Sequence, residues 1–190
     1  QYGQHVIGQL VYQGNAPAEE LKQEAVQARI RLVSFVGYQG LLDFSEYVER
    51  QTQRLADDKV YPPRLYVTQK LLYQQGNEQV LYDNAYQTVR EWLNEPRSQF
   101  MLILGEFGTG KTFLLRELAR RMGEEKTPLQ PIFLDMRRLE KSHEIDMLVA
   151  QQLAAQKMVF DPAKFRYMLD QGLVVLLFDG YDELALRVTY

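Results

Sequence analysis

Eight residues, 105–112, read GEFGTGKT and constrain the fold more than any other part of the sequence. They follow the pattern Gly-x-x-x-x-Gly-Lys-Ser/Thr, which works only between a strand and a helix. An apolar run at 100–104 precedes the motif and predicts a buried strand, and residues 111–122 have a helical composition. Glycines let such a loop wrap closely around a phosphate, and the helix N-terminus adds a partial positive charge. The motif therefore predicts a P-loop that binds a nucleoside triphosphate.

The roles of the side chains follow from this chemistry. Lys111 is expected to reach the β- and γ-phosphates, which makes it both a binding and a catalytic residue, and Thr112 to offer its hydroxyl to Mg²⁺. The predicted nucleotide cradle comprises Gly105, Glu106, Phe107, Gly108, Thr109, Gly110, Lys111, Thr112 and Phe113.

A second acidic segment, LVVLLFDGYDE at 173–183, completes the predicted site. Asp179 ends an apolar strand, where ligands bind in open α/β sheets, and we expect it to hold Mg²⁺ through water. Asp182 and Glu183 follow, and either one could orient or deprotonate the attacking water, with Glu183 preferred. The alternative is a strand that ends in an acidic surface turn.

Two further candidates carry weaker signals. Asp135 ends the strand PIFLD and could face the γ-phosphate, although such acids more often simply end a strand. Glu20 and Lys22 have the Glu-x-Lys spacing of some metal nucleases, but they fall in a predicted helix, where a solvated face is the better interpretation.

The rest of the chain predicts an α/β fold in which a parallel sheet is flanked by helices. Unalternating apolar strands are typical of such sheets. The strands are expected at 6–12, 30–35, 100–104, 131–135 and 173–178, and the helices at 17–27, 41–57, 78–93, 111–122, 144–155 and 162–170. Two adjacent prolines in the segment 57–64 favour a boundary there. We therefore divide the chain into a smaller α/β segment at 1–57, a linker with a helical segment at 58–98, and an NTPase core at 99–190.

Composition narrows the partners. The net charge of −3 provides no global attraction to nucleic acid, and the lack of cysteine rules out disulfides and thiolate chemistry within this chain. No apolar run approaches the roughly 18 residues of a membrane span, so we expect no membrane partner and a cytoplasmic location.

The motifs GEFGTGKT and FDGYDE together resemble the NACHT group of signalling NTPases, within the larger STAND class. The resemblance covers roughly residue 66 to the end, and it implies a switch that holds ADP at rest, exchanges it for ATP on meeting a trigger, hydrolyses slowly and forms homo-oligomers. It also implies an N-terminal effector, adenine contacts near residues 64–67, and a role in prokaryotic antiphage defence. In this class a later strand lies between the P-loop strand and the Asp179 strand, so we expect the sheet to be incomplete at the C-terminal side.

Residues 6–43 resemble the last part of a restriction-endonuclease-like fold, in which a strand, a helix and a strand close the domain. This resemblance implies DNA as a partner of the effector, with the metal-binding acids upstream of Gln1. The alternative is a generic α/β linker. For the whole protein, the alternatives to a switch are an AAA-like motor that acts on nucleic acid or protein, and a scaffold in which the nucleotide is structural.

Overall fold

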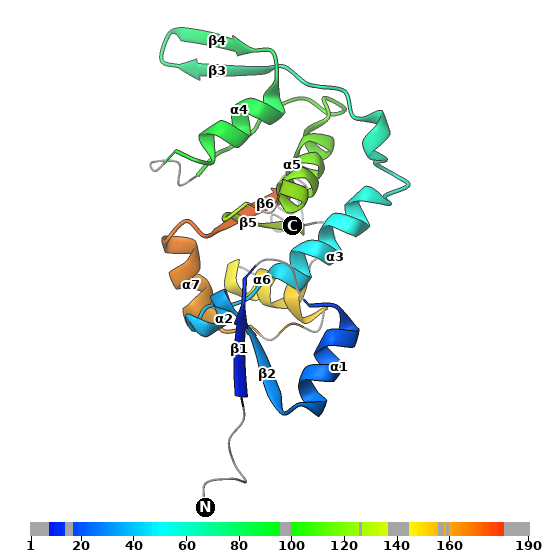
Figure 1. The fold of residues 1–190 in the computed structure, drawn as a ribbon. Helices are drawn as coiled ribbons and strands as arrows, with labels where there is room; N and C mark the ends of the chain where they lie inside the picture. Colours follow the sequence, from blue (N-terminus) through cyan, green and yellow to red (C-terminus); the bar gives the residue numbers. More distant parts are fainter. Residues whose placement is uncertain are drawn as a thin grey trace, which may run out of the picture.

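The N-terminal part forms a small parallel β-α-β unit (Figure 1). The computed structural model describes residues 8–13, 17–95, 100–125, 127–136, 145–155, 158 and 160–180. The unit consists of β1 (Gly8–Tyr12), α1 (Glu19–Gln27), β2 (Ile30–Ser34) and the short helix α2 (Phe35–Tyr38). The strands pair from Gly8 with Ile30 to Tyr12 with Ser34. The predicted order of strand, helix and strand is confirmed, whereas α2 was not predicted.

A second parallel pair forms the centre of the molecule. It joins β5 (Gln130–Asp135) to β6 (Val174–Asp179), and the register places Asp135 opposite Asp179. The helix α5 (Lys111–Glu125) covers one face, while α6 (Ile145–Ala154) and α7 (Pro162–Asp170) cover the other (Figure 1). Phe133 and Leu177 pack on the α5 side, and Ile132 and Leu134 on the opposite side. Both faces are therefore apolar, as expected of a parallel strand in an α/β fold.

The helix α3 (Ser45–Ala56) lies against the edge of this sheet and belongs to its core. Gln51 is fully buried, and its side-chain Nε2 donates to the carbonyl of Pro131 while its Oε1 accepts from the backbone N–H of Phe133, each at 2.9 Å. On its other side α3 crosses α5 closely. The glycine at position 123 of α5 permits this approach, since a Cβ added there would lie 2.0 Å from Thr52 Oγ1 of α3. The domain boundary at Asp57 stays a prediction. In the structure, however, α3 packs against the NTPase half of the chain.

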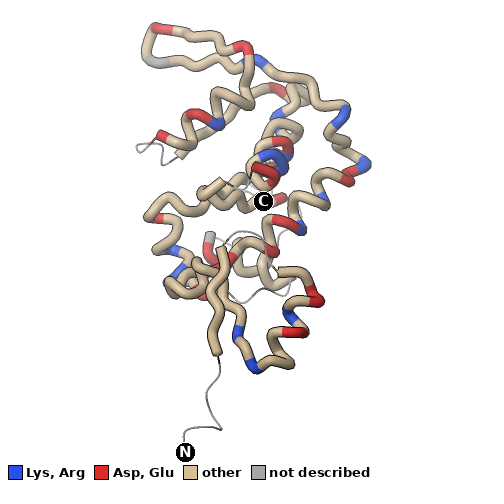
Figure 2. Tube along the Cα trace, viewed as in Figure 1, with Lys and Arg blue, Asp and Glu red and all other residues tan. Residues whose placement is uncertain are grey.

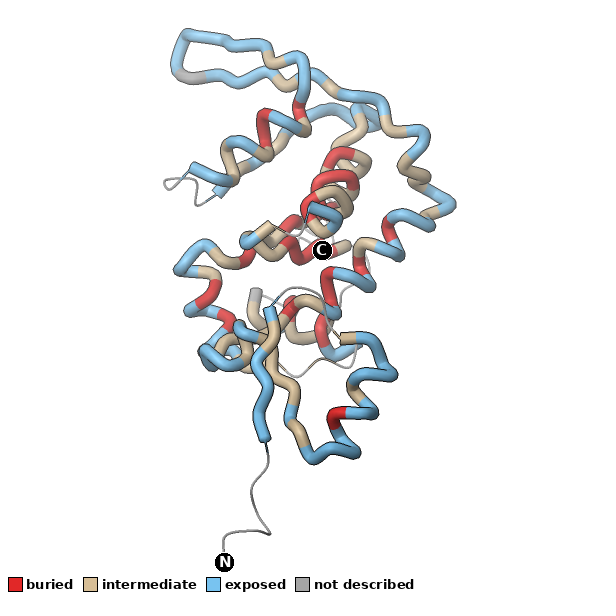
Figure 3. Tube along the Cα trace, in the orientation of Figure 1, coloured by how far each residue is buried: buried red, intermediate tan, exposed pale blue. Residues whose placement is uncertain are grey.

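A β-hairpin and a helix occupy the segment before the P-loop, where one long helix was predicted at 78–93. After a 3₁₀ turn (Pro63–Leu65), β3 (Leu71–Gln75) pairs antiparallel with β4 (Glu78–Tyr82), and α4 (Ala85–Trp92) follows. The helix prediction was therefore wrong over 78–82. A Gly-Asn turn at 76–77 reverses the chain, and the rings of Tyr73 and Tyr82 pack on Trp92. Most of the hairpin is exposed (Figure 3).

The prediction of a buried strand at 100–104 was also wrong. The described strands include none in this segment, and Phe100, Leu102 and Leu104 are 84%, 62% and 79% exposed. Met101 and Ile103 pack against the core on the α5 side. The physical reason is that a strand needs a hydrogen-bonded neighbour, and the described sheet contains only β5 and β6. The partial α/β architecture agrees with the predicted fold class.

Substitution of Gln51 by Leu should destabilise the protein by about 2–4 kcal/mol, because two buried backbone groups of β5 would lose their partners. Urea denaturation should show the loss. The matched control is Gln53→Leu on the same helix, where the side chain is exposed and its Nε2 donates to Asp57. An equal, small effect of both substitutions would contradict the assignment of Gln51 as the clamp on this strand.

Candidate nucleotide site

The P-loop residues form an open turn in front of α5. Lys111 Nζ donates to the carbonyls of Gly105 and Glu106, at 2.6 and 2.8 Å. Gly110 has a φ of 88°, a backbone conformation that favours glycine. The helix begins at Lys111, so the first backbone N–H groups of α5 face the loop without partners inside the helix. Such a loop suits an anion. A bound anion would replace the two carbonyls as the acceptor of the hydrogen bonds from the Lys111 ammonium group.

Thr112 and Asp179 join the two predicted halves of the site. Thr112 Oγ1 donates to Asp179 Oδ1 at 2.9 Å, although the residues are 67 positions apart in the sequence. Asp179 is only 4% exposed at the end of β6, and Thr112 is half-buried in the first turn of α5. A hydroxyl and a carboxylate are hard oxygen donors of the type that Mg²⁺ prefers. The donor set therefore fits a magnesium ion.

Asp135 lies at the same edge of the sheet as Asp179. The two residues are register partners, and the backbone N–H of Met136 donates to the Asp179 carbonyl at 2.9 Å. Asp135 is therefore placed as a neighbour of the predicted metal ligand, while its role stays a prediction. Asp182 and Glu183 lie outside the described residues.

The linker before β3 packs on the first turns of α5. The ring of Tyr61 meets Phe113 edge to face at a centroid distance of 5.2 Å, and Tyr66 lies 6.3 Å from the same ring. The segment 64–67, predicted to contact adenine, thus lies beside a residue of the predicted cradle. The adenine contact itself stays a prediction.

An ion pair fixes the start of this linker to α5. Arg116 Nη2 donates to Asp58 Oδ2 at 2.5 Å, and its guanidinium lies over the rings of Tyr61 and Phe133 at 4.8 and 5.3 Å. Burial alone would raise the pKa of Asp58. The backbone N–H groups of Tyr61 and Val60, together with Arg116, outweigh burial and hold this pKa below its usual value.

The second half of α5 carries charges of both signs (Figure 2). Glu117 is 4% exposed and accepts hydrogen bonds from Arg120 and Arg121. The Arg121 guanidinium lies 5.6 Å from the ring centre of Tyr66 and 4.5 Å from that of Tyr86. The network therefore braces the linker and α4 against the P-loop helix.

Asp58 and Gln69, which contact this region, were not predicted from the sequence. Gln69 Nε2 donates to the carbonyl of Gly110 at 3.3 Å. Neither residue belongs to a motif, and their partners lie 58 and 41 positions away, so no local spacing could reveal them.

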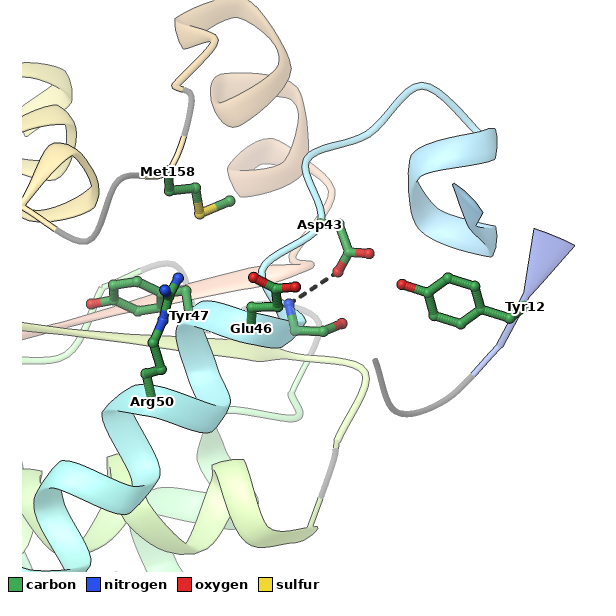
Figure 4. A pocket seen from close by; sticks show the side chains of 7 residues that line it. Tyr12, Asp43, Glu46, Tyr47, Arg50 and Met158 are labelled. Carbon is green, nitrogen blue, oxygen red and sulfur yellow. Dashed lines mark hydrogen bonds between the residues drawn. The ribbon is translucent and has the colours of Figure 1, made fainter. Parts of the chain in front are cut away.

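Two cavities lie away from the P-loop. One of about 270 Å³ separates the N-terminal unit from the α6–α7 connection (Figure 4). In it, Asp43 accepts from the backbone N–H of Ser45 at 3.0 Å and thereby satisfies one donor at the start of α3. Its lining residues are Tyr12, Asp43, Ser45, Glu46, Tyr47, Arg50 and Met158. A second cavity of about 440 Å³ lies between the hairpin and residues 100–103.

The fold and the site define a P-loop nucleotide-binding protein, and comparison with known proteins identifies the domains. Residues 99–188 match the family model of the NACHT domain, and residues 1–44 match the family described as NACHT-associated inactive Restriction Endonuclease 2. The chain therefore carries a NACHT domain preceded by a segment of this endonuclease-related family, which confirms the suspected architecture. NACHT domains are nucleoside triphosphatases of the P-loop class.

One curated relative is an uncharacterized WD repeat-containing protein of Nostoc sp., 31% identical over 108 residues. The matched region covers 51% of this chain and 7% of that relative. No solved structure matches the chain. In the described parts of the chain, no helix is long and apolar enough to cross a membrane.

Substitution of Asp58 by Asn should lower the free energy of unfolding at neutral pH by about 1–3 kcal/mol, since a charged hydrogen bond to Arg116 is lost. Because folding lowers the pKa of Asp58, its contribution is full above the unfolded pKa and is lost as the pH falls through the folded one.

Denaturation from pH 7 to pH 3 should therefore show a difference in the free energy of unfolding between wild type and Asp58→Asn. This difference should become smaller below about pH 4. The control is Asp57→Asn, at the neighbouring exposed carboxylate. A difference that stays constant across this range would disprove the role of the ion pair.

Proposed function

We propose that this protein is a nucleotide-dependent signalling switch that binds ATP and ADP with Mg²⁺ at the P-loop. The observation that carries the proposal is the Thr112–Asp179 hydrogen bond, which brings the phosphate loop and the acidic strand end to one point. The NACHT match over 99–188 supports a switch over a polymer-driven motor. Trigger-dependent assembly of copies and a role in antiphage defence are part of this proposal.

The residues of the chain have separable tasks in this proposal. Lys111 holds the β- and γ-phosphates, and Thr112 and Asp179 hold the magnesium ion, which neutralises phosphate charge when bound. Glu183, with Asp182 as the second choice, orients the attacking water. Adenine is bound near residues 64–67, beside the Phe113 ring.

The N-terminal segment is proposed to act as an effector or adaptor by binding a partner rather than by cutting DNA. Its family is described as inactive. The Glu-x-Lys spacing of Glu20 and Lys22 does not argue for a nuclease site. Both residues lie on the helix α1, and Lys22 forms ion pairs with Glu46 and Glu19. Among the described residues, no group of three or more His, Cys, Asp or Glu side chains could hold a metal ion.

The turnover of ATP by the full-length protein tests the switch directly. A switch should hydrolyse slowly, retain ADP through purification, and form larger assemblies when ATP replaces ADP in the presence of its trigger. Rapid hydrolysis that DNA, RNA or an unfolded protein stimulates strongly would instead indicate a motor.

Substitution of Lys111 by Ala should weaken ATP and ADP binding about 10- to 100-fold, because a charged donor to the phosphates is lost. Titration calorimetry on the full-length protein would measure the effect. The matched control is Lys164→Ala, at an exposed lysine of α7. Affinity that stays within a few-fold of wild type for Lys111→Ala would place the nucleotide elsewhere.

Substitution of Asp179 by Asn should remove most of the gain in ATP affinity that Mg²⁺ provides. The amide keeps the shape of the side chain but loses the charge that a divalent cation requires. Dissociation constants for ATP would be compared in excess Mg²⁺ and in EDTA. Asp170→Asn, at an exposed acid of α7, is the control. An unchanged magnesium effect in Asp179→Asn would show that other residues hold the ion.

A further inference from the structure

We propose that Gln69 is a positioning residue for the P-loop, a side chain that fixes the peptide between Gly110 and Lys111 from outside the motif. This inference rests on the proposed nucleotide site. This residue lies just before the hairpin, and it belongs to no sequence motif.

The contact between Gln69 and the loop is close. Gln69 Nε2 donates to the Gly110 carbonyl at 3.3 Å, and a Cβ added at Gly110 would lie 2.5 Å from the same nitrogen. A side chain at position 110 would therefore collide with the amide, in addition to the strain of the positive φ. The glycine here serves the approach of Gln69 as well as the turn.

The Gly110 carbonyl is held from two directions. It also accepts the backbone N–H of Leu114 at 2.9 Å, the first hydrogen bond of α5. Because a trans peptide is planar, its C=O and the following N–H point in opposite directions. Holding the Gly110 carbonyl along the helix therefore holds the backbone N–H of Lys111 towards the loop, where a phosphate oxygen would accept it.

Gln69 is itself tied to the elements around it. Its backbone carbonyl accepts from the N–H of Ala85 at 2.8 Å, at the start of α4. The next residue, Lys70, pairs with Asp83 at 2.7 Å across the base of the hairpin. Gln69 thus connects the P-loop to the hairpin and to α4, so a shift of one would be passed to the others.

The other half of the amide provides a means to test the donor. Gln69 Oε1 is buried without a hydrogen-bond partner among the described residues, so only the N–H end of the amide holds the loop. Gln69→Met keeps the length of the side chain and removes the donor. Gln69→Glu places a carboxylate against the Gly110 carbonyl, and it can donate only when it is protonated.

The experiment measures ADP affinity of the full-length protein between pH 7.5 and pH 5.5, each variant relative to wild type. We expect Gln69→Met to bind about 3- to 10-fold more weakly at every pH, in line with one lost hydrogen bond. Gln69→Glu should bind more weakly than Gln69→Met at pH 7.5. Because burial raises the pKa of a carboxyl, it should recover as the pH falls and then bind better than Gln69→Met. Gln79→Met, at an exposed position of β4, is the control.

Hydrogen exchange without nucleotide gives a second readout. Peptides that cover 105–112 and 84–88 should exchange faster in Gln69→Met than in wild type, and Gln79→Met should leave them unchanged. If wild type bound no nucleotide, the proposed function would fail, and exchange alone would decide the positioning role. The inference is overturned if Gln69→Met keeps wild-type affinity and exchange, or if Gln69→Glu recovers only to the level of Gln69→Met, since repulsion alone would then explain its loss.

Discussion

The amide of Gln51 takes the place of a neighbouring strand at the outer edge of β5. An edge strand leaves peptide groups that need partners, and burial makes an unpaired group costly. Gln51 satisfies one donor and one acceptor of β5 while it is itself fully buried. The helix α3 is therefore part of the sheet's hydrogen bonding as well as of its packing, and it cannot leave the sheet without exposing both groups.

This clamp sets how the N-terminal unit is joined to the NACHT domain. The match to the endonuclease-related family ends at residue 44, and α3 begins at Ser45. Asp43, at the junction, holds the first turn of α3 through the N–H of Ser45. Only the short segment 39–44 connects the N-terminal unit to α3, and its residues Leu41, Leu42 and Phe44 pack in the core of the sheet. A flexible tether would allow the two parts to move independently, and this arrangement favours coupled movement.

The parts that the sequence predicted well are those in which local pattern and final environment agree. The strands at 131–135 and 173–178 are apolar throughout because both faces of the sheet are covered, and the P-loop motif requires the helix that follows it. The strand β4 was mistaken for the first part of a helix because the Gly-Asn turn at 76–77 is short, and Tyr82 of β4 packs on Trp92 of the helix that follows. The segment 100–104 has the composition of a strand, but composition does not supply the hydrogen-bonded neighbour. Gln51 and Gln69 act on partners 80 and 41 residues away, which no periodicity encodes.

The linker contacts one face of the P-loop helix in order. Gly110, just before α5, and Phe113 and Arg116 within it are spaced by three residues, so each lies next to the one before it along the helix surface. Arg116 is bound by Asp58, Phe113 is packed by Tyr61 and Tyr66, and Gly110 is held by Gln69. The linker therefore runs along α5 towards the phosphate end as the chain leaves α3. The linker thus joins this end of the helix to α3, whose Gln51 is bound to β5. The P-loop helix therefore contacts α3 in two ways, through the linker and by the direct packing of Gly123 against Thr52.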